Sequence, residues 1–222
     1  MPAKKIICLA ASKKHGGFCY AGKDEAGRWV RPVSDEEGHA ISAYWRVVGR
    51  GDPAVVGDVL RMNVGASKPS AWQTENVAHV EEHWRRLGKA SYDDIVALVD
   101  NPDALWPGGR STNHGVDDEM TEAQAQQFDH SLLLIRVDDL VVSCTDEGYD
   151  EAKLKTRAFF SFKGHRYGFV VTDTNFRPEA VRDDEIGEAV LCCSLAEAYE
   201  WGDGTRHVSK LVAAIITPET LG

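Results

Sequence analysis

Short strand-like segments recur along nearly the whole chain, and this feature most limits what its 222 residues can fold into. In each segment apolar residues alternate with polar ones or form a brief run, and Gly, Pro or polar residues follow. The segments predicted as strands are 4–10, 18–21, 28–33, 58–64, 76–80, 132–137, 140–144, 153–162, 166–173, 189–194 and 207–216. Many short strands with hairpin turns are typical of small barrels or sandwiches.

Helices are few in this pattern. Capping residues predict short helices over 34–48, 91–99 and 121–128, and a fourth is expected over 178–186. We therefore expect a mainly β (α+β) protein built from two β-barrel-like units. Residues 1–130 hold the N-terminal unit with an acidic connector of helices and loops at about 64–130, and residues 131–222 hold the C-terminal unit.

The net charge of −10 argues against a protein that binds duplex DNA by bulk electrostatics, because such binding depends on many Lys and Arg side chains. The charges are unevenly spread. Residues 1–62 hold 10 basic and 7 acidic side chains, residues 63–130 hold 5 and 12, and residues 131–222 hold 10 and 16. A local basic surface is therefore compatible with the acidic total, and the acidic middle offers an alternative docking surface for a protein partner.

Several other classes of protein lack their signatures here. The longest apolar runs are far shorter than the roughly 18 residues of a membrane-spanning helix, and the N-terminus has no signal-peptide cleavage pattern. The five cysteines form neither a metal-ligand spacing nor an even disulfide set. We expect a cytoplasmic protein without metal, cofactor or membrane partner.

Cations and aromatic rings gather in the first predicted hairpin. The residues are Lys13, Lys14, His15, Arg28, Trp29 and Arg31. Proteins hold single-stranded nucleic acid with this combination, because rings stack on bases while cations meet phosphates. The alternative interpretation is an ordinary solvated strand face.

A second basic segment lies in the C-terminal unit. Alternation over 153–162 places three cations and one ring on one face of the strand and apolar residues on the other, and the next strand adds a cation and a ring. These candidates are Lys153, Lys155, Arg157, Phe159, Arg166 and Tyr167. The same pattern also fits any half-exposed antiparallel strand, so both interpretations stay open.

Catalytic signatures are absent: the sequence has no G-x-S-x-G elbow, H-E-x-x-H, P-loop or G-x-G-x-x-G. The remaining alternative is an enzyme or nucleotide sensor with an anion-binding loop near Asp117. That loop would consist of Arg110, Ser111, Thr112, Asn113 and His114. The acids at 117–119 are better explained as a capping turn before a helix, so we assign no catalytic residue and expect a protein that is not an enzyme.

Several segments resemble a known family. They are KKIICLAASKKHGG at 4–17, GRWVRPVS at 27–34 and KLVAAII at 210–216, together with the Leu105-Trp106 loop that contains Ser111 and Gly115, and Arg157-Ala158 leading to Val171-Thr172-Asp173. They resemble the bacterial dual OB-containing domain family over about residues 4 to 216. The resemblance implies two OB-like barrels and nucleic-acid binding, and it carries no active site. The hypothesis is a module that binds single-stranded DNA or RNA, or a structured RNA, across the two basic segments.

Overall fold

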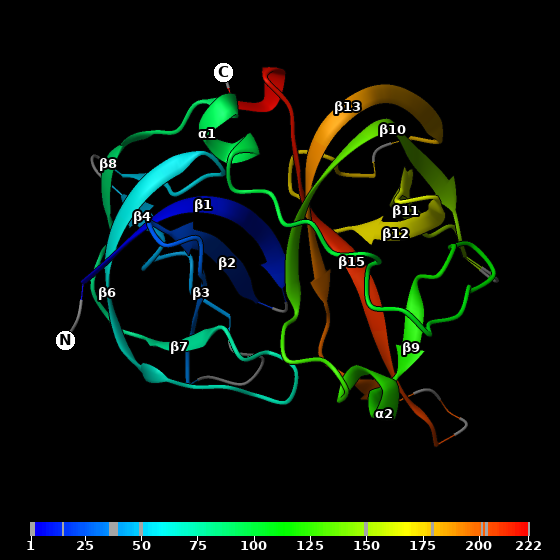
Figure 1. Ribbon diagram of the computed structural model, residues 1–222, viewed down its shortest axis with the longest axis horizontal. Coiled ribbons are helices and arrows are strands. Elements are labelled where there is room, and N and C mark those ends of the chain that lie inside the picture. Colours follow the sequence, from blue (N-terminus) through cyan, green and yellow to red (C-terminus); the bar gives the residue numbers. More distant parts are fainter. Residues whose placement is uncertain are drawn as a thin grey trace.

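Two five-stranded barrels make up most of the chain (Figure 1). The computed structural model describes residues 3–14, 16–35, 40–48, 51–148, 151–178, 180–200, 202 and 204–221. In this part of the chain, no helix is long and apolar enough to cross a membrane. The mainly β fold expected from the sequence is confirmed.

The first barrel uses the N-terminal strands. They are β1 (Ala3–Lys14), β2 (Gly17–Asp24), β3 (Trp29–Val33), β6 (Asp58–Ser67) and β7 (Asn76–His79). Their order is β1-β2-β3-β7-β6, and the pairing of β6 with β1 closes the barrel. β3 and β7 are parallel, while the other neighbours are antiparallel. Its core contains Ile6, Tyr20, Val30 and Leu60.

The second barrel repeats this order with later strands. They are β10 (Leu132–Asp146), β11 (Leu154–Phe162), β12 (His165–Val171), β13 (Arg182–Leu195) and β15 (Arg206–Ile216). The order β12-β11-β10-β13-β15 closes through a parallel pairing of β15 with β12. When the strands of each barrel are numbered 1 to 5 in chain order, both barrels have the spatial order 1-2-3-5-4-1, and strands 3 and 5 are parallel. The two barrels share this topology although the sequence shows no internal repeat.

Shorter elements complete the fold. They are β4 (Val47–Val48), β5 (Asp52–Pro53), β8 (Arg85–Lys89), α1 (Tyr92–Val96), β9 (Glu119–Thr121), α2 (Glu122–Ala125), β14 (Tyr199–Glu200) and a 3-10 turn, η1 (Glu219–Leu221). β8 pairs with β6, whereas β9 and β14 pair with β15. Leu105, Trp106 and Met120 belong to the second core, so the segment before residue 131 contributes to both barrels.

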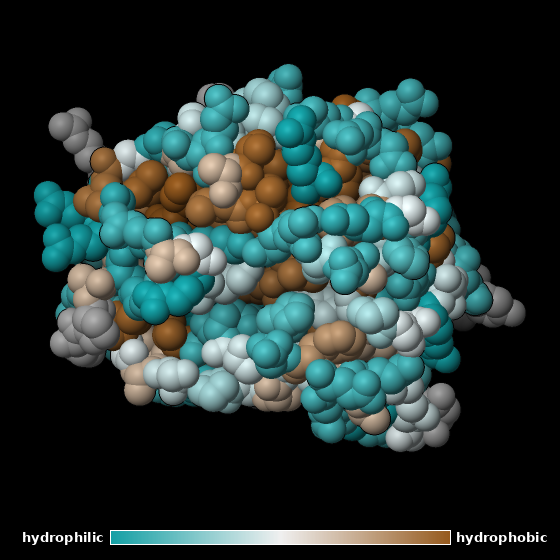
Figure 2. Space-filling model, in the orientation of Figure 1, coloured by the Kyte–Doolittle hydropathy of each residue, from teal (hydrophilic) through white to brown (hydrophobic). Residues whose placement is uncertain are grey.

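A shared apolar core joins the barrels. Leu9 and Ala21 of the first barrel pack with Leu134 and Ala213 of the second, and Ile95 of α1 closes the cluster. Figure 2 shows apolar side chains in a band across the upper half of this face, around the region where Figure 1 places α1 and the upper end of β6. The two barrels thus bury surface against each other directly.

Polar contacts cross the same junction. The Lys23 ammonium lies 2.5 Å from Asp100, whose other carboxylate oxygen accepts a hydrogen bond from the backbone N–H of Leu134 at 2.8 Å. Arg31 Nη2 donates to Ser131 Oγ at 2.8 Å. These contacts fix how the two barrels sit relative to each other.

Two predicted helices are wrong. Within the described part of 34–48, Ile41 pairs with Phe18 as an isolated bridge and 47–48 form β4, because Ile41 and Val48 turn into the first core. The predicted helix at 178–186 is replaced from Arg182 onward by β13, whose first residues pair with the far end of β10. Residues 36–39 and 179 lie outside the described part of the chain. A long neighbouring strand outweighed local helix preference in the second case.

The other two helices are confirmed in shortened form. Ser91 caps α1 and Thr121 caps α2, and each side chain accepts a hydrogen bond from the backbone N–H three residues on. The Lys163-Gly164 turn between β11 and β12 lies in the gap between the predicted strands 153–162 and 166–173. Its φ angles of 51° and 81° are both positive, which is the backbone of a type I′ hairpin.

Candidate nucleic-acid interface

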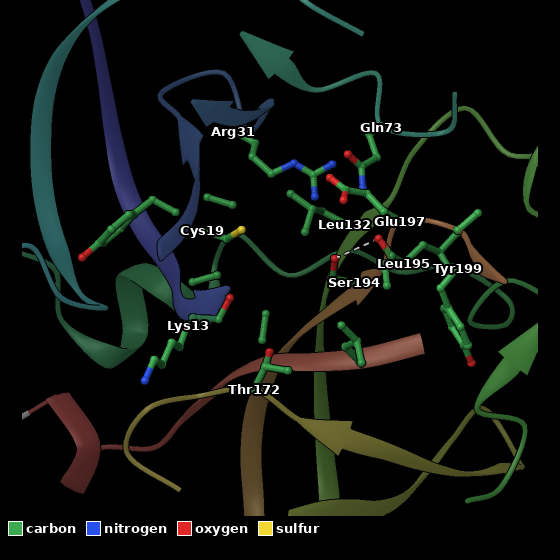
Figure 3. A pocket seen from close by; sticks show the side chains of 18 residues that line it. Lys13, Cys19, Arg31, Gln73, Leu132, Thr172, Ser194, Leu195, Glu197 and Tyr199 are labelled. Atoms are coloured by element: carbon green, nitrogen blue, oxygen red, sulfur yellow. Dashed lines mark hydrogen bonds between the residues drawn. The ribbon is translucent and has the colours of Figure 1, made fainter. Parts of the chain in front are cut away.

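A cavity of about 400 Å³ lies between the barrels (Figure 3). The first barrel supplies β1, β2, β3 and the loop between β6 and β7, through residues such as Cys19, Arg31 and Gln73. The second barrel supplies β13, β15 and the segment after β13, through residues such as Ser194 and Tyr199. The surface of strands 2 and 3 in the first barrel therefore faces the second barrel across this cavity.

A second cavity, of about 410 Å³, adjoins the first. Lys13 and Thr172 line both cavities, so the two are neighbours around this pair of side chains. Phe176 and Arg177 line the far side. We call the two cavities together the inter-barrel groove.

The polar side chains of the first cavity differ in how freely they can meet a ligand. Arg31 is 8% exposed, donates from Nε to Asn76 Oδ1 at 2.7 Å, and is paired with Glu75. Ser194 Oγ donates to the backbone carbonyl of Leu195 at 3.3 Å, the dashed line in Figure 3. Lys13 is exposed at the opposite side of the cavity from Arg31. Lys13 is thus the exposed cation where the two cavities meet.

Asp173 forms part of the floor of the second cavity. Its carboxylate is 6% exposed and accepts hydrogen bonds from the backbone N–H groups of Asn175 and Ile215, both at 2.9 Å. Burial raises the pKa of Asp173, and the two hydrogen bonds only partly oppose this shift. The carboxylate holds the segment after β12 against β15, which gives the groove a fixed wall.

The N-terminal candidates do not form one exposed cluster. Arg28 is exposed but pairs with Asp24 at 3.0 Å; burial favours the neutral acid, yet the hydrogen bonds of Arg28, Ala26 and Lys4 lower the pKa of Asp24 to about 2. Trp29 packs against the shared core, with Lys23 Nζ 5.1 Å from its ring centre. The side chain of Lys14 and all of His15 lie outside the described part. Of the early candidates, Lys13 and the buried Arg31 line the groove.

The expected basic strip on β11 is corrected by the structure. Lys153 is exposed, but Lys155 pairs with Glu147 at 3.3 Å. Arg157 is 5% exposed and pairs with Asp118 at 2.9 Å and Glu147 at 2.5 Å. The segment containing Asp118 covers this face of β11, which strand alternation alone does not reveal. The strip is therefore not a continuous cationic surface.

The aromatic candidates of the second barrel pack against other parts of the protein. A Cβ on Gly168 would lie 2.6 Å from the Phe159 ring, so that ring lies directly over the glycine. Tyr167 is 1% exposed, and its hydroxyl accepts a hydrogen bond from the N–H of Leu105 at 3.1 Å. Arg166 is exposed at the start of β12. Neither cavity of the groove is lined by these residues, so the early and late candidates do not share one site.

The alternative anion-binding loop is internally braced. Thr112 donates from its N–H and its hydroxyl to Asp118, and the N–H of Gly115 donates to Thr112 Oγ1. These donors are thus occupied. Arg110, Ser111, Thr112 and Asn113 do line a third cavity of about 620 Å³ together with Glu119 and His207, whereas His114 is exposed outside it.

Acids of the middle segment neutralise buried cations of the barrels. Among the residues that the structure describes, four such pairs are present: Glu75 with Arg31, Asp100 with Lys23, Asp117 with Lys210, and Asp118 with Arg157. Lys210 is fully buried, and burial lowers its pKa although Asp117 acts in the opposite direction. A large part of the acidic excess at 63–130 is therefore structural.

Several residues that line the groove are not among the site residues predicted from the sequence. They are Gln73, Thr172, Phe176, Arg177, Ser194 and Tyr199. They come from loops and strand ends far apart in the chain, and none lies in a basic or aromatic run. Among the segments that carry the family resemblance, Val171-Thr172-Asp173 lies at the groove, but the resemblance gave it no binding role.

The strand order defines the class of protein. A closed five-stranded Greek-key barrel with this path is an OB fold, and the chain contains two of them. The chain matches the model of the dual OB-containing domain family over residues 4–215, and it belongs to that family. No curated protein matches it, and neither does any solved structure. OB folds bind oligonucleotides and oligosaccharides, which makes nucleic acid a possible ligand of this chain.

Proposed function

We propose that this protein binds single-stranded nucleic acid in the inter-barrel groove. The carrying observation is that the first cavity opens on the strand 2 and 3 surface of the first barrel and adjoins the second cavity at Lys13 and Thr172. That surface and the loops beside it are where OB folds bind oligonucleotides. Two linked cavities suit successive units of a chain ligand better than one compact molecule.

The chemistry of the groove supports this ligand class. A volume of about 400 Å³ lies within the range of small-ligand sites, and the first cavity offers apolar walls from Leu132 and Leu195. The buried Gln73 amide also lines it, and its Oε1 accepts a hydrogen bond from Asn76 at 3.3 Å. A base inserted there would stack on the walls and present its edge to Gln73. Lys13 would then meet the next phosphate, and Phe176 would lie beside the following base.

The net charge of −10 shapes this proposal. Phosphates are repelled by the acidic surface as a whole, so binding depends on a ligand that fills the groove rather than on contact with the backbone alone. A duplex cannot insert a base into the first cavity without unpairing it. Single strands and unpaired loops of structured RNA are therefore the preferred ligands.

Titration of labelled single-stranded DNA, single-stranded RNA and duplex DNA tests the proposal at two salt concentrations. Thr172→Trp fills the point where the cavities meet and should weaken single-strand binding by roughly 1–3 kcal/mol, the value of one stacked base. Lys13→Glu should weaken binding and reduce its salt dependence. Equal affinity of the Thr172→Trp variant and the unchanged protein would remove the groove from consideration.

Two control variants make the same changes in size and charge outside the groove. Thr145→Trp adds the same bulk on β10, outside the groove, and Lys163→Glu makes the same charge change at an exposed turn of the second barrel. Neither control should alter affinity. The thermal midpoint of each variant shows whether it is folded.

The cavity over the 110–113 loop supports a second candidate function, the binding of a small anionic ligand such as a nucleotide. His207 is 2% exposed, its Nδ1 lies 3.3 Å from Glu119, and its Nε2 has no hydrogen-bond partner. Arg110 supplies the cation at this cavity, and an anionic ligand would share it with Glu119, to which Arg110 Nε and Nη2 donate. A thermal-shift screen of nucleotides should raise the midpoint of the protein but not of the Ser111→Trp variant, and no shift with any nucleotide would exclude this candidate.

A further inference from the structure

Three cations lie side by side on the outer face of the first barrel, away from the groove. Lys5 of β1 is the cross-strand partner of Arg61 of β6, and Arg61 is in turn the partner of Arg85 of β8. All three side chains are exposed. Neighbouring strands are about 4.8 Å apart, so this rung of cations spans roughly 10 Å across three strands. We call these residues the cation rung.

The rung differs from its surroundings in how its charge is compensated. On the same strand as Arg85, Arg86 and Lys89 both pair with the fully buried Asp58, at 2.8 and 3.3 Å. Lys5 pairs with Glu25 at 2.9 Å, and both of those side chains are exposed. Among the residues that the structure describes, no acid lies within ion-pair distance of Arg61 or Arg85.

Folding gains nothing from this arrangement. Like charges directly opposite each other on neighbouring strands destabilise a sheet. A cation at Arg85 has a structural explanation, because β8 is an edge strand and charged residues protect edges from unwanted pairing. That explanation does not cover Arg61 or Lys5, which lie on strands paired on both sides.

We propose that the cation rung binds the phosphate backbone of the nucleic acid, at a place separate from the groove. None of the three residues lines either cavity, so the rung touches the ligand only through phosphates. Contacts of this kind orient a nucleic acid and add affinity without reading bases. The inference rests on the proposed function for its ligand class, and it adds a second contact surface to that function.

The test is the salt dependence of oligonucleotide binding by an Arg61→Gln, Arg85→Gln double variant. Each phosphate contact on a single strand contributes about 0.7 to the slope of log K against log salt, so the slope should fall by about 1.4. Preference among base sequences should not change. An Arg61→Lys, Arg85→Lys variant should retain most of the slope because it retains the charge.

The control is Lys163→Gln with Arg166→Gln, which removes the same charge from the exposed β11–β12 turn and the exposed start of β12, outside the rung and the groove. Equal slopes for the double variant and the unchanged protein, or equal losses in the double variant and the control, would overturn the rung. If rung variants weaken binding while Thr172→Trp does not, the rung stands and the groove proposal fails. If Thr172→Trp weakens binding while rung variants keep the full slope, the groove stands and the rung fails.

Discussion

Arg157 shows how a single side chain takes its role from its surroundings. Its guanidinium is 5% exposed between the carboxylates of Asp118 and Glu147. Burial disfavours the charged guanidinium, but its hydrogen bonds to Glu147 and the charge of Asp118 raise the pKa of Arg157. Burial likewise opposes ionisation of Glu147, and Arg157 more than offsets it by lowering the pKa of that acid. This arginine holds the 108–118 segment against β11.

Removal of this buried charge should be costly. We expect Arg157→Met to lower the free energy of unfolding by about 3–5 kcal/mol, because two buried carboxylates lose their partner. Urea denaturation measures the loss, and the variant that still folds should bind oligonucleotides as before. Lys153→Met, at the exposed residue just before β11, should change the free energy of unfolding by less than about 0.5 kcal/mol. A loss of stability below about 1 kcal/mol in Arg157→Met would show that the two carboxylates do not depend on this arginine.

The hairpin of β11 and β12 illustrates the scale of single elements. Phe162 and His165 are paired residues, so the turn consists of the two residues between them, and both have positive φ. Gly164 has a φ of 81° and nothing within 4 Å of its would-be Cβ, so the constraint there is backbone conformation rather than space. Turn chemistry of this kind is local, and the predicted strands 153–162 and 166–173 end and begin beside this turn.

Substitution of that glycine should cost stability through the backbone alone. Gly164→Ala is expected to lower the free energy of unfolding by about 1 kcal/mol, since alanine tolerates this φ poorly. Gly88→Ala is the matched control: its Cβ also meets nothing within 4 Å and its φ is not positive. Chemical denaturation should show a clear loss for the first variant and a change below about 0.5 kcal/mol for the second. Equal losses would contradict the strain argument.

The whole molecule behaves as two barrels with one shared core. Ile95 is fully buried in the cluster that contains Leu9 and Leu134, one from each barrel. The Lys23–Asp100 contact and the Arg31–Ser131 hydrogen bond cross the same boundary. The inter-barrel groove exists only because the barrels are held in this relation, so its geometry depends on the junction.

Unfolding should accordingly be a single cooperative event. Far-ultraviolet circular dichroism and tryptophan fluorescence should give coincident denaturation curves. Ile95→Ala should shift both curves together, at a cost of about 2–5 kcal/mol for the lost side chain and the cavity left behind. Two separate transitions, or a shift in one signal only, would show that the barrels fold independently.

Local patterns were sufficient for much of the architecture. Strand periodicity located most barrel strands, and Ser91 and Thr121 marked two helix starts. Elsewhere local patterns failed: 182–186 has a helical pattern but pairs with β10, since a partner strand supplies hydrogen bonds that a short helix cannot match. The groove could not be predicted from sequence alone, because Gln73, Thr172 and Tyr199 meet only after both barrels close.

The sequence by itself determined the strands, their turns and the membership of a two-barrel family, because alternation and turn chemistry act over a few residues. Tertiary structure alone decided which charges remain available to a ligand. The sequence pattern predicts Arg31 and Arg157 as exposed cations. In the structure both are buried, and Glu75 and Asp118, each tens of residues away along the chain, neutralise them. Buried charges require partners, and the partner that folding brings can come from any part of the chain.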